Sequence, residues 1–234
     1  MEVAKKYTPT NLGEVVFPNQ TVKTRIKAYA SNSLSGDLML WGPNGTSKTT
    51  VANLLPYLIG GENPYIERDP DSLLKEVDLK AYLSQASHNA CLFNTSPIVF
   101  LVFHEFDDAK GTMSKLWKAL DEVNEPNRQA MLIVTTNNPM QIHQSLLARF
   151  DDIEFPKVKV MNFLRRAQHI LQQEGVDLPD QQVIAILKTV ESYGNLRKYC
   201  KKLDEIIYLH SHNLPIPSPC TPTTNPSLSI VSSK

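Results

Sequence analysis

The sequence predicts an α/β fold with a parallel sheet, followed by a small helical domain. Apolar runs alternate with helical patterns over residues 37–156, which is typical of β-α-β units. The runs rarely alternate between apolar and polar residues, as expected of strands buried on both faces. After residue 156 the runs stop, and apolar residues recur at helical spacing. We therefore expect an α/β domain over residues 1–156 and a helical domain over residues 157–212.

The elements follow in chain order. A basic lead-in over residues 1–36 contains one predicted helix, Thr21–Ser31. The predicted strands are Asp37–Trp41, Ile98–Phe103, Ala130–Thr135 and Ile153–Phe155. In the helical domain the predicted helices are Val160–Glu174, Asp180–Glu191 and Gly194–His210. Asp180 is expected to be the N-cap of its helix. Residues 213–234 contain five prolines, many Ser and Thr and no aromatic residue, which predicts a disordered tail.

Composition excludes several classes of protein. The 24 basic and 24 acidic side chains cancel, so no global field attracts nucleic acid or membrane. Any DNA contact must come from a local patch or from a channel formed by several subunits. The three cysteines, Cys91, Cys200 and Cys220, contain no C-x-x-C pair, which excludes a zinc ribbon or a disulfide framework. With no signal peptide and no membrane-length apolar run, we expect a cytoplasmic protein, or one in a host cytoplasm if phage-encoded.

A phosphate-binding loop is predicted directly after the first strand. The sequence "GPNGTSKT" from Gly42 to Thr49 follows the pattern G-x-x-x-x-G-K-[ST], with Ser47 in place of the last glycine. In this pattern backbone amides hold phosphates, the lysine reaches the β and γ phosphates, and the hydroxyl binds magnesium. Serine costs backbone freedom at this position but is small enough to start a helix. A glycine-rich turn that binds nothing is the alternative, and the flanking strand and helix argue against it. The residues predicted to bind nucleotide here are Gly42, Pro43, Asn44, Gly45, Thr46, Ser47, Lys48, Thr49 and Thr50.

The helix after this loop contains Pro56. An interior proline costs about 3 kcal/mol, so Pro56 is expected to end or kink that helix early.

Two later strands end in polar residues. "FLVFHEFD" ends on His104 and Glu105, and "AMLIVTTNNP" ends on consecutive threonines and asparagines. A core strand with a solvated acidic end is the alternative for the first of these. Its position downstream of a phosphate loop favours a functional site instead. Unpaired amides are costly in a core, so the second strand also indicates a site at its end.

The order of these features resembles that of AAA+ ATPases, and within them the clamp-loader group: replication factor C small subunits and the phage clamp-loader ATPase subunit. The resemblance runs from about Ala4 to Glu205. "GPNGTSKTT" resembles the Walker A motif, and "FLVFHEFD" resembles Walker B except at His104. "KKYTPTNLGEVV" is similar to the N-terminal segment of that group. The resemblance implies a P-loop AAA+ sandwich with a helical lid, and an adenine pocket lined by this segment, including Val15 and Val16.

The resemblance also implies roles for four further residues. Glu105 would polarise the attacking water, and Asn137 in "IVTTNN" would orient it as sensor 1. Arg149 in "SLLARFDDIEF" would be an arginine finger, although clamp loaders usually have Ser-Arg-Cys where this chain has Ala-Arg-Phe. Arg197 in "YGNLRKYCKKLDEI" would touch the γ-phosphate as sensor 2. An ordinary surface role is the alternative for each of the two arginines.

The implied cofactors are ATP and Mg²⁺. The implied metal-binding residues are Thr49 and His104, and the latter stands where the family has an aspartate. Magnesium prefers oxygen ligands, so a neutral imidazole predicts weakened hydrolysis.

The implied function is an ATP-binding and ATP-hydrolysing motor that loads sliding clamps in DNA replication. The alternative is a structural or regulatory nucleotide-binding subunit, or a helicase loader, with weak or no hydrolysis. The expected partners are a homo- or hetero-oligomeric AAA+ ring, primed or single-stranded DNA, and a sliding clamp or helicase, with no membrane. The collar domain that normally follows the lid in this group is replaced here by a Pro- and Ser-rich segment.

Overall fold

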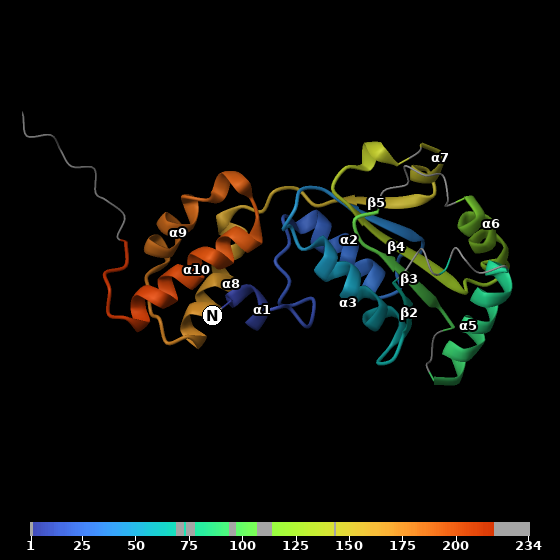
Figure 1. Cartoon of the computed structure of the whole chain (residues 1–234), viewed down its shortest axis with the longest axis horizontal. Helices are drawn as coiled ribbons and strands as arrows, with labels where there is room; N and C mark the ends of the chain where they lie inside the picture. The colour runs from blue at the N-terminus through green and yellow to red at the C-terminus, as the bar shows by residue number, and fades with distance from the viewer. Residues whose placement is uncertain are drawn as a thin grey trace, which may run out of the picture.

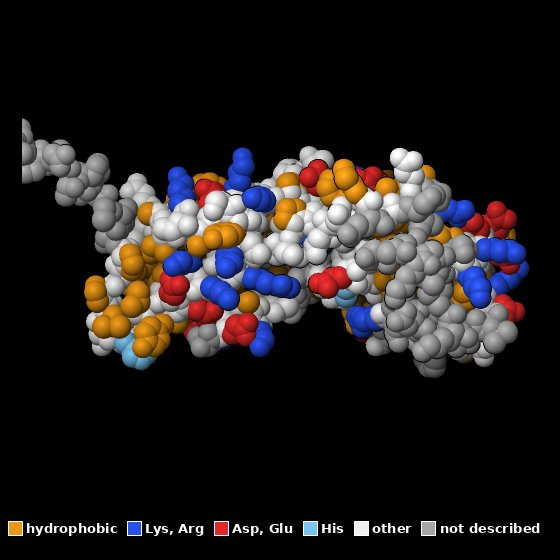
Figure 2. All heavy atoms as spheres, turned by 45° about the horizontal axis from the view of Figure 1, so that its top comes forward, with side chains coloured by type: hydrophobic (Ala, Val, Ile, Leu, Met, Phe, Trp, Pro, Cys, Tyr) orange, Lys and Arg blue, Asp and Glu red, His pale blue; other side chains and the backbone are white. Residues whose placement is uncertain are grey.

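The computed structural model describes residues 2–68, 73, 78–93, 97–106, 114–142 and 144–217. An α/β domain and a helical domain lie end to end (Figure 1). Of the predicted tail, residues 213–217 contain no helix or strand, and residues 218–234 lie outside the described part of the chain. None of the helices in the described ranges has both the length and the apolar character needed to span a membrane. On the face seen in Figure 2, basic and acidic side chains are mixed.

Five parallel strands form one sheet in the order β2-β3-β4-β1-β5. The strands are β1 (Asp37–Trp41), β2 (Tyr65–Glu67), β3 (Val99–Phe103), β4 (Ala130–Thr136) and β5 (Phe150–Glu154). β4 lies between β1 and β3, with Thr136 opposite Trp41 and Val134 opposite Phe103. Because all strands run the same way, the segments that follow β1, β3 and β4 meet at one edge of the sheet.

The first three predicted strands lie where the apolar runs placed them, to within one residue at either end. β5 begins three residues earlier than predicted, because Asp151 and Asp152 interrupt its apolar pattern. Arg25 and Tyr29 bind the first of these carboxylates, and the Tyr29 hydroxyl donates to Asp151 Oδ2 over 2.6 Å. The edge strand β2 was not predicted, since three residues are too few for a periodic pattern.

Helices cover both faces of the sheet. One face is covered by α2 (Gln20–Ala30) and α3 (Lys48–Gly60), the other by α5 (Leu79–Phe93) and α6 (Ser114–Val123). Alternate residues of β3 therefore enter different cores: Phe100 and Val102 pack with α3, and Leu101 and Phe103 pack with α5 and α6. This double burial explains the uninterrupted apolar runs. Two short elements, η1 (Pro139–Gln141) and α7 (Gln144–Leu147), connect β4 to β5.

Pro56, which was expected to end or kink its helix, does not end it. α3 continues to Gly60, because Leu55 and Ile59 on either side of the proline are buried against the sheet. The prediction that Asp180 is an N-cap is wrong: Pro179 occupies that position and Asp180 is the first helical residue. The Asp180 carboxylate instead accepts a hydrogen bond from Gln168 Nε2 over 2.8 Å.

The helical domain is a bundle of α8 (Val160–Gln173), α9 (Asp180–Lys188) and α10 (Leu196–Ser211). The rings of Phe163 and Tyr199 stack at its centre, 5.3 Å apart. α9 ends before its predicted boundary at Glu191, and a short 3-10 turn, η2 (Glu191–Tyr193), follows it.

The N-terminal segment joins the two domains. Its helix α1 (Val3–Lys6) packs against α10 rather than the sheet (Figure 1). The backbone N–H of Val3 donates to Asp204 Oδ1 over 3.0 Å. Lys6 Nζ and Tyr7 Oη both donate to Glu174 Oε1, over 2.6 and 2.5 Å. The chain then returns to the α/β domain, so residues 2–18 contact both domains.

Candidate functional site

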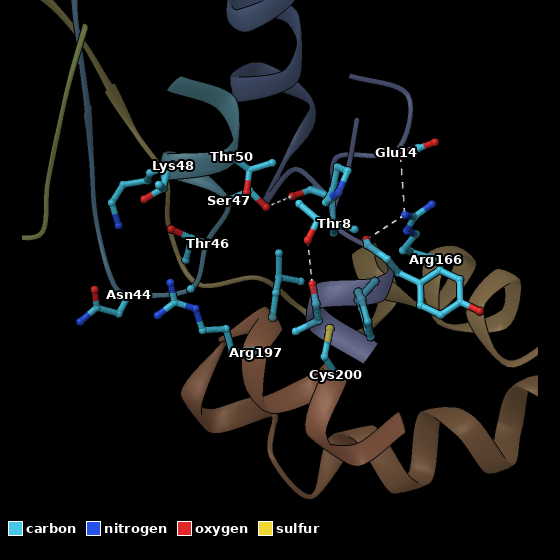
Figure 3. A pocket seen from close by; sticks show the side chains of 18 of the residues that line it. Thr8, Glu14, Asn44, Thr46, Ser47, Lys48, Thr50, Arg166, Arg197 and Cys200 are labelled. Atoms are coloured by element: carbon cyan, nitrogen blue, oxygen red, sulfur yellow. Dashed lines mark hydrogen bonds and ion pairs between the residues drawn. The ribbon is translucent and has the colours of Figure 1, made fainter. Parts of the chain in front are cut away.

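A cavity of about 220 Å³ opens where the α/β domain, the N-terminal segment and the helical domain meet (Figure 3). The strand order brings the segments after β1, β3 and β4 to one side of it. The α/β domain contributes the loop residues 44–50, Glu105, Thr135, Thr136 and Asn137. The N-terminal segment and the helical domain contribute Ala4, Tyr7, Thr8, Pro9, Glu14, Val16, Phe163, Arg166, Ile170, Leu196, Arg197 and Cys200.

The loop between β1 and α3 has an unusual backbone. Gly42, Gly45 and Ser47 have φ values of 135°, 76° and 73°. A Cβ atom on Gly42 would lie 2.3 Å from the carbonyl oxygen of Phe155, and one on Gly45 would lie 2.1 Å from Asn195 Oδ1. Both glycines are therefore required by conformation and by space.

Ser47 stands where the loop pattern has its last glycine, and it adopts the left-handed conformation that glycine would favour. For a residue with a Cβ atom this costs roughly 1–2 kcal/mol. The Ser47 hydroxyl donates to the carbonyl oxygen of Val16 over 3.1 Å, which offsets part of that cost. The same bond ties the loop to the N-terminal segment.

The ammonium group of Lys48 is held by the loop itself. Lys48 is only 6% exposed, and its Nζ donates to the carbonyl oxygens of Gly42 and Pro43, 2.7 Å from each. These two residues hold the lysine and do not line the cavity. Burial lowers the pKa of Lys48 to about 8, and the positive charge of Arg197 contributes. Within the described ranges no carboxylate forms an ion pair with this lysine. An anion in the cavity would supply the missing charge.

The end of β3 positions His104 and Glu105 differently. Glu105 lines the cavity with a left-handed backbone, φ 53°. His104 is not among the lining residues: its Nε2 lies 3.2 Å from Asn53 Oδ1 and its Nδ1 lies 3.4 Å from Thr135 Oγ1. Partial burial lowers the pKa of His104, as does the charge of Arg68, whereas Glu105 opposes them. The imidazole is therefore neutral near pH 7.

The sensor residues and the arginine finger predicted from the sequence lie in different places. Asn137 lines the cavity directly after β4. Arg197 lines it from the first turn of α10 (Figure 3). Arg149 does not line it. Its Nη1 lies 2.7 and 2.6 Å from the carboxylate oxygens of Asp121, and its guanidinium lies 5.5 Å from the ring centre of Trp117 on α6.

The two valines predicted to line an adenine pocket lie in different places. Val16 lines the cavity, but Val15 packs into the core of the α/β domain beneath α2. Sequence reasoning missed Arg166, whose charged group lies 3.8 Å from that of Glu14 at the cavity wall (Figure 3). The sequence gives only a weak indication that Arg166 faces the cavity. Phe163, Arg166 and Ile170 are three and four residues apart, which places them on one face of α8.

A magnesium ion has few protein ligands available here. In the part of the chain that the structure describes, no three His, Cys, Asp or Glu residues form a cluster suited to a metal. Thr49 and Glu105 line the cavity and carry the oxygen ligands that magnesium prefers. These two residues fit the ion, and the His104 imidazole, which contacts protein atoms through both nitrogens, does not.

Comparisons with known proteins agree with this arrangement. Residues 38–157 match the model of the ATPase family associated with various cellular activities (AAA). A replication factor C small subunit from Thermofilum pendens is 29% identical over 199 residues, covering 83% of this chain and 59% of the relative. Replication factor C subunit 3 from Oryza sativa is 27% identical over 205 residues, covering 83% and 54%. The chain thus spans a little over half the length of these relatives.

The fold is similar to that of a solved structure from Thermotoga maritima, the RuvB Holliday junction branch migration motor. The TM-score is 0.63 at 17% identity, covering 90% of this chain and 69% of that one. At this identity the likeness concerns the fold alone.

The pKa of Lys48 generates a testable prediction. A bound triphosphate favours the charged lysine and raises its pKa above about 8, so binding at higher pH must take up a proton. ATP affinity should therefore fall as the pH rises above about 8, by up to about tenfold per pH unit. Fluorescent-ATP titrations in EDTA measure this without a metal, at pH values where the phosphates are fully ionised.

Lys48→Arg is the matched control, because a guanidinium stays charged throughout this range. Whatever affinity that variant retains should not follow the wild-type pH dependence. Parallel pH profiles for the two proteins would show that Lys48 does not titrate at the site.

Proposed function

Because the chain belongs to the ATPase family associated with various cellular activities (AAA), we propose that it binds and hydrolyses ATP as a clamp-loader-like subunit in DNA replication. One observation carries this proposal: the cavity joins the phosphate loop, Glu105, Asn137 and Arg197. The similarity to replication factor C subunits over 83% of the chain supports the role in replication. The cytoplasm, or a host cytoplasm for a phage protein, is the compartment that fits this role.

Binding of ATP uses the start of α3. Lys48 is the first residue of that helix, so backbone N–H groups and the positive end of the helix dipole face the phosphates. Lys48 would exchange its carbonyl partners for the β and γ phosphates. The Thr49 hydroxyl would hold Mg²⁺, which neutralises phosphate charge when bound. The base would lie between Val16 and the α8 residues Phe163 and Ile170.

Hydrolysis would use three of the polar side chains around the cavity, each for a different task. Glu105 accepts a proton from the attacking water, and the Asn137 amide orients that water. Arg197 approaches the γ-phosphate from the helical domain and stabilises the charge that develops there. Its position in the first turn of α10 makes this contact sensitive to how the two domains lie.

Histidine at position 104, where the family has an aspartate, favours slow turnover of ATP. A neutral imidazole lacks the negative charge of the family's aspartate, and here it contacts Asn53 and Thr135 instead of lining the cavity. Among the residues that the structure describes around the cavity, Thr49 and Glu105 are then left as protein ligands for magnesium. The same observation supports the second candidate function, a nucleotide-binding structural or regulatory subunit, or a helicase loader, with little hydrolysis.

The position of Arg149 supports assembly of several subunits. Because its guanidinium lies outside the cavity of its own chain, on α6, it would serve a nucleotide held by a neighbouring subunit. This supports a ring of identical or related AAA+ subunits. Primed or single-stranded DNA and a sliding clamp or helicase are the proposed partners of such a ring.

Steady-state ATP turnover tests the proposed function directly. We expect turnover that rises when primed DNA is added, and none in Lys48→Ala, because no other loop residue supplies a compact cation to the phosphates. ATP binding without turnover, with or without DNA, would favour the structural subunit. Unchanged ATP affinity in Lys48→Ala would contradict the nucleotide site itself.

Arg149→Ala should retain ATP affinity but lose about 10³–10⁵ in turnover, as expected of an arginine finger. Arg165→Ala, an exposed α8 arginine outside the cavity, is the control and should turn over normally. Mixing Arg149→Ala with Lys48→Ala should restore activity, since the first protein holds nucleotide and the second supplies the finger. Normal turnover by Arg149→Ala alone would rule out this role.

His104→Asp should raise kcat with magnesium, because a carboxylate restores the hard, charged ligand that the ion prefers. His88→Asp, at an exposed position on α5, controls for the added charge and should leave kcat unchanged. Turnover at several magnesium concentrations is the measurement. A folded His104→Asp protein with a lower kcat would mean that the imidazole itself contributes to the reaction.

A further inference from the structure

Glu105 has a backbone conformation that needs outside support. It follows β3 with φ 53°, and its side chain is exposed at the cavity. For a residue with a Cβ atom the left-handed region costs roughly 1–2 kcal/mol. Such a conformation persists only where neighbouring groups hold it. The direction of the Glu105 carboxylate depends on those groups.

Thr135 supplies that support from the neighbouring strand β4. It is 3% exposed, and its hydroxyl oxygen accepts a hydrogen bond from the backbone N–H of Glu105 over 3.3 Å. Its carbonyl oxygen accepts from the backbone N–H of Phe106 over 2.8 Å. The Phe106 ring is itself buried in the core beside α6. One threonine thus holds the turn on both of its consecutive amides.

The hydroxyl of Thr135 has a second partner that fixes its orientation. His104 Nε2 lies 3.2 Å from Asn53 Oδ1, which only accepts hydrogen bonds, so the tautomer that satisfies this contact carries its proton on Nε2. Nδ1 then accepts, and the Thr135 hydroxyl, 3.4 Å away, is its donor. The hydroxyl therefore donates to His104 while it accepts from Glu105. Asn53, His104, Thr135 and Glu105 form one ordered chain of hydrogen bonds.

We propose that Thr135 is a positioning residue that holds the Glu105 turn and so directs its carboxylate to the attacking water. This rests on the proposed hydrolysis of ATP. The hydroxyl of Thr135 is occupied on both sides by protein atoms, so the residue acts through Glu105 rather than on the nucleotide.

Thr135→Val tests the proposal, because valine keeps the shape of threonine and removes the hydroxyl. We expect kcat to fall about 10- to 100-fold, the loss expected of a misplaced catalytic group, with ATP affinity unchanged. Thr135→Ser keeps the hydroxyl and should restore most of kcat. Thr189→Val removes an exposed hydroxyl of the helical domain, which donates only to the Ile186 carbonyl, and should leave kcat unchanged.

In a Glu105→Gln background, Thr135→Val should have no further effect on kcat. A further loss there, or an unchanged kcat in Thr135→Val alone, overturns the proposal.

Amide hydrogen exchange separates this proposal from the proposed function. Thr135→Val should speed exchange at the Glu105 amide, whereas Thr189→Val should not. If that amide keeps its wild-type protection in Thr135→Val, the positioning role is overturned whether or not the protein hydrolyses ATP. If the wild-type protein binds ATP without turnover, the proposed hydrolysis fails, and faster exchange in Thr135→Val still establishes that Thr135 holds the turn.

Discussion

The path of the phosphate loop is the constraint on which the rest of the site depends. Between β1 and α3 the backbone has left-handed residues, and a Cβ atom on Gly42 would meet Phe155, just after β5, while one on Gly45 would meet Asn195 of the helical domain. The backbone N–H of Leu196 also donates to the carbonyl oxygen of Gly45, over 2.8 Å. The loop therefore has no room to change without moving both neighbours. The burial of Lys48 and the approach of Arg197 to the cavity follow from this contact.

The second organising element is the end of β4. The backbone carbonyls of its last two residues, Thr135 and Thr136, accept hydrogen bonds from the segments that follow the two neighbouring strands, β3 and β1. The carbonyl oxygen of Thr136 accepts from the Gly42 N–H over 3.2 Å, and that of Thr135 accepts from the Phe106 N–H over 2.8 Å. The phosphate loop and the Glu105 turn are thus fixed relative to each other through one strand. Because β4 is central and buried, this spacing is rigid.

The sequence carried enough information to predict the strands β1, β3 and β4 and the phosphate-loop side of the cavity, for different reasons. Uninterrupted apolar runs identify strands buried on both faces, whereas Asp151 and Asp152 hid the start of β5. Lys48 and Asn137 belong to short motifs that keep their order in the chain, so both could be assigned to one site. Arg166 could not, because it enters the cavity only through packing of the helical domain on the N-terminal segment.

The hydrogen bond from Val3 to Asp204 joins residues 201 positions apart, and it has a consequence for how the protein is made. During synthesis α1 leaves the ribosome long before α10, its packing partner. The α/β domain, whose final strand ends at Glu154, can complete its sheet long before that. Val3 must then remain without its apolar neighbours until the helical bundle forms around it. The nascent chain therefore completes its cavity only after α10 has left the ribosome and packed against α1.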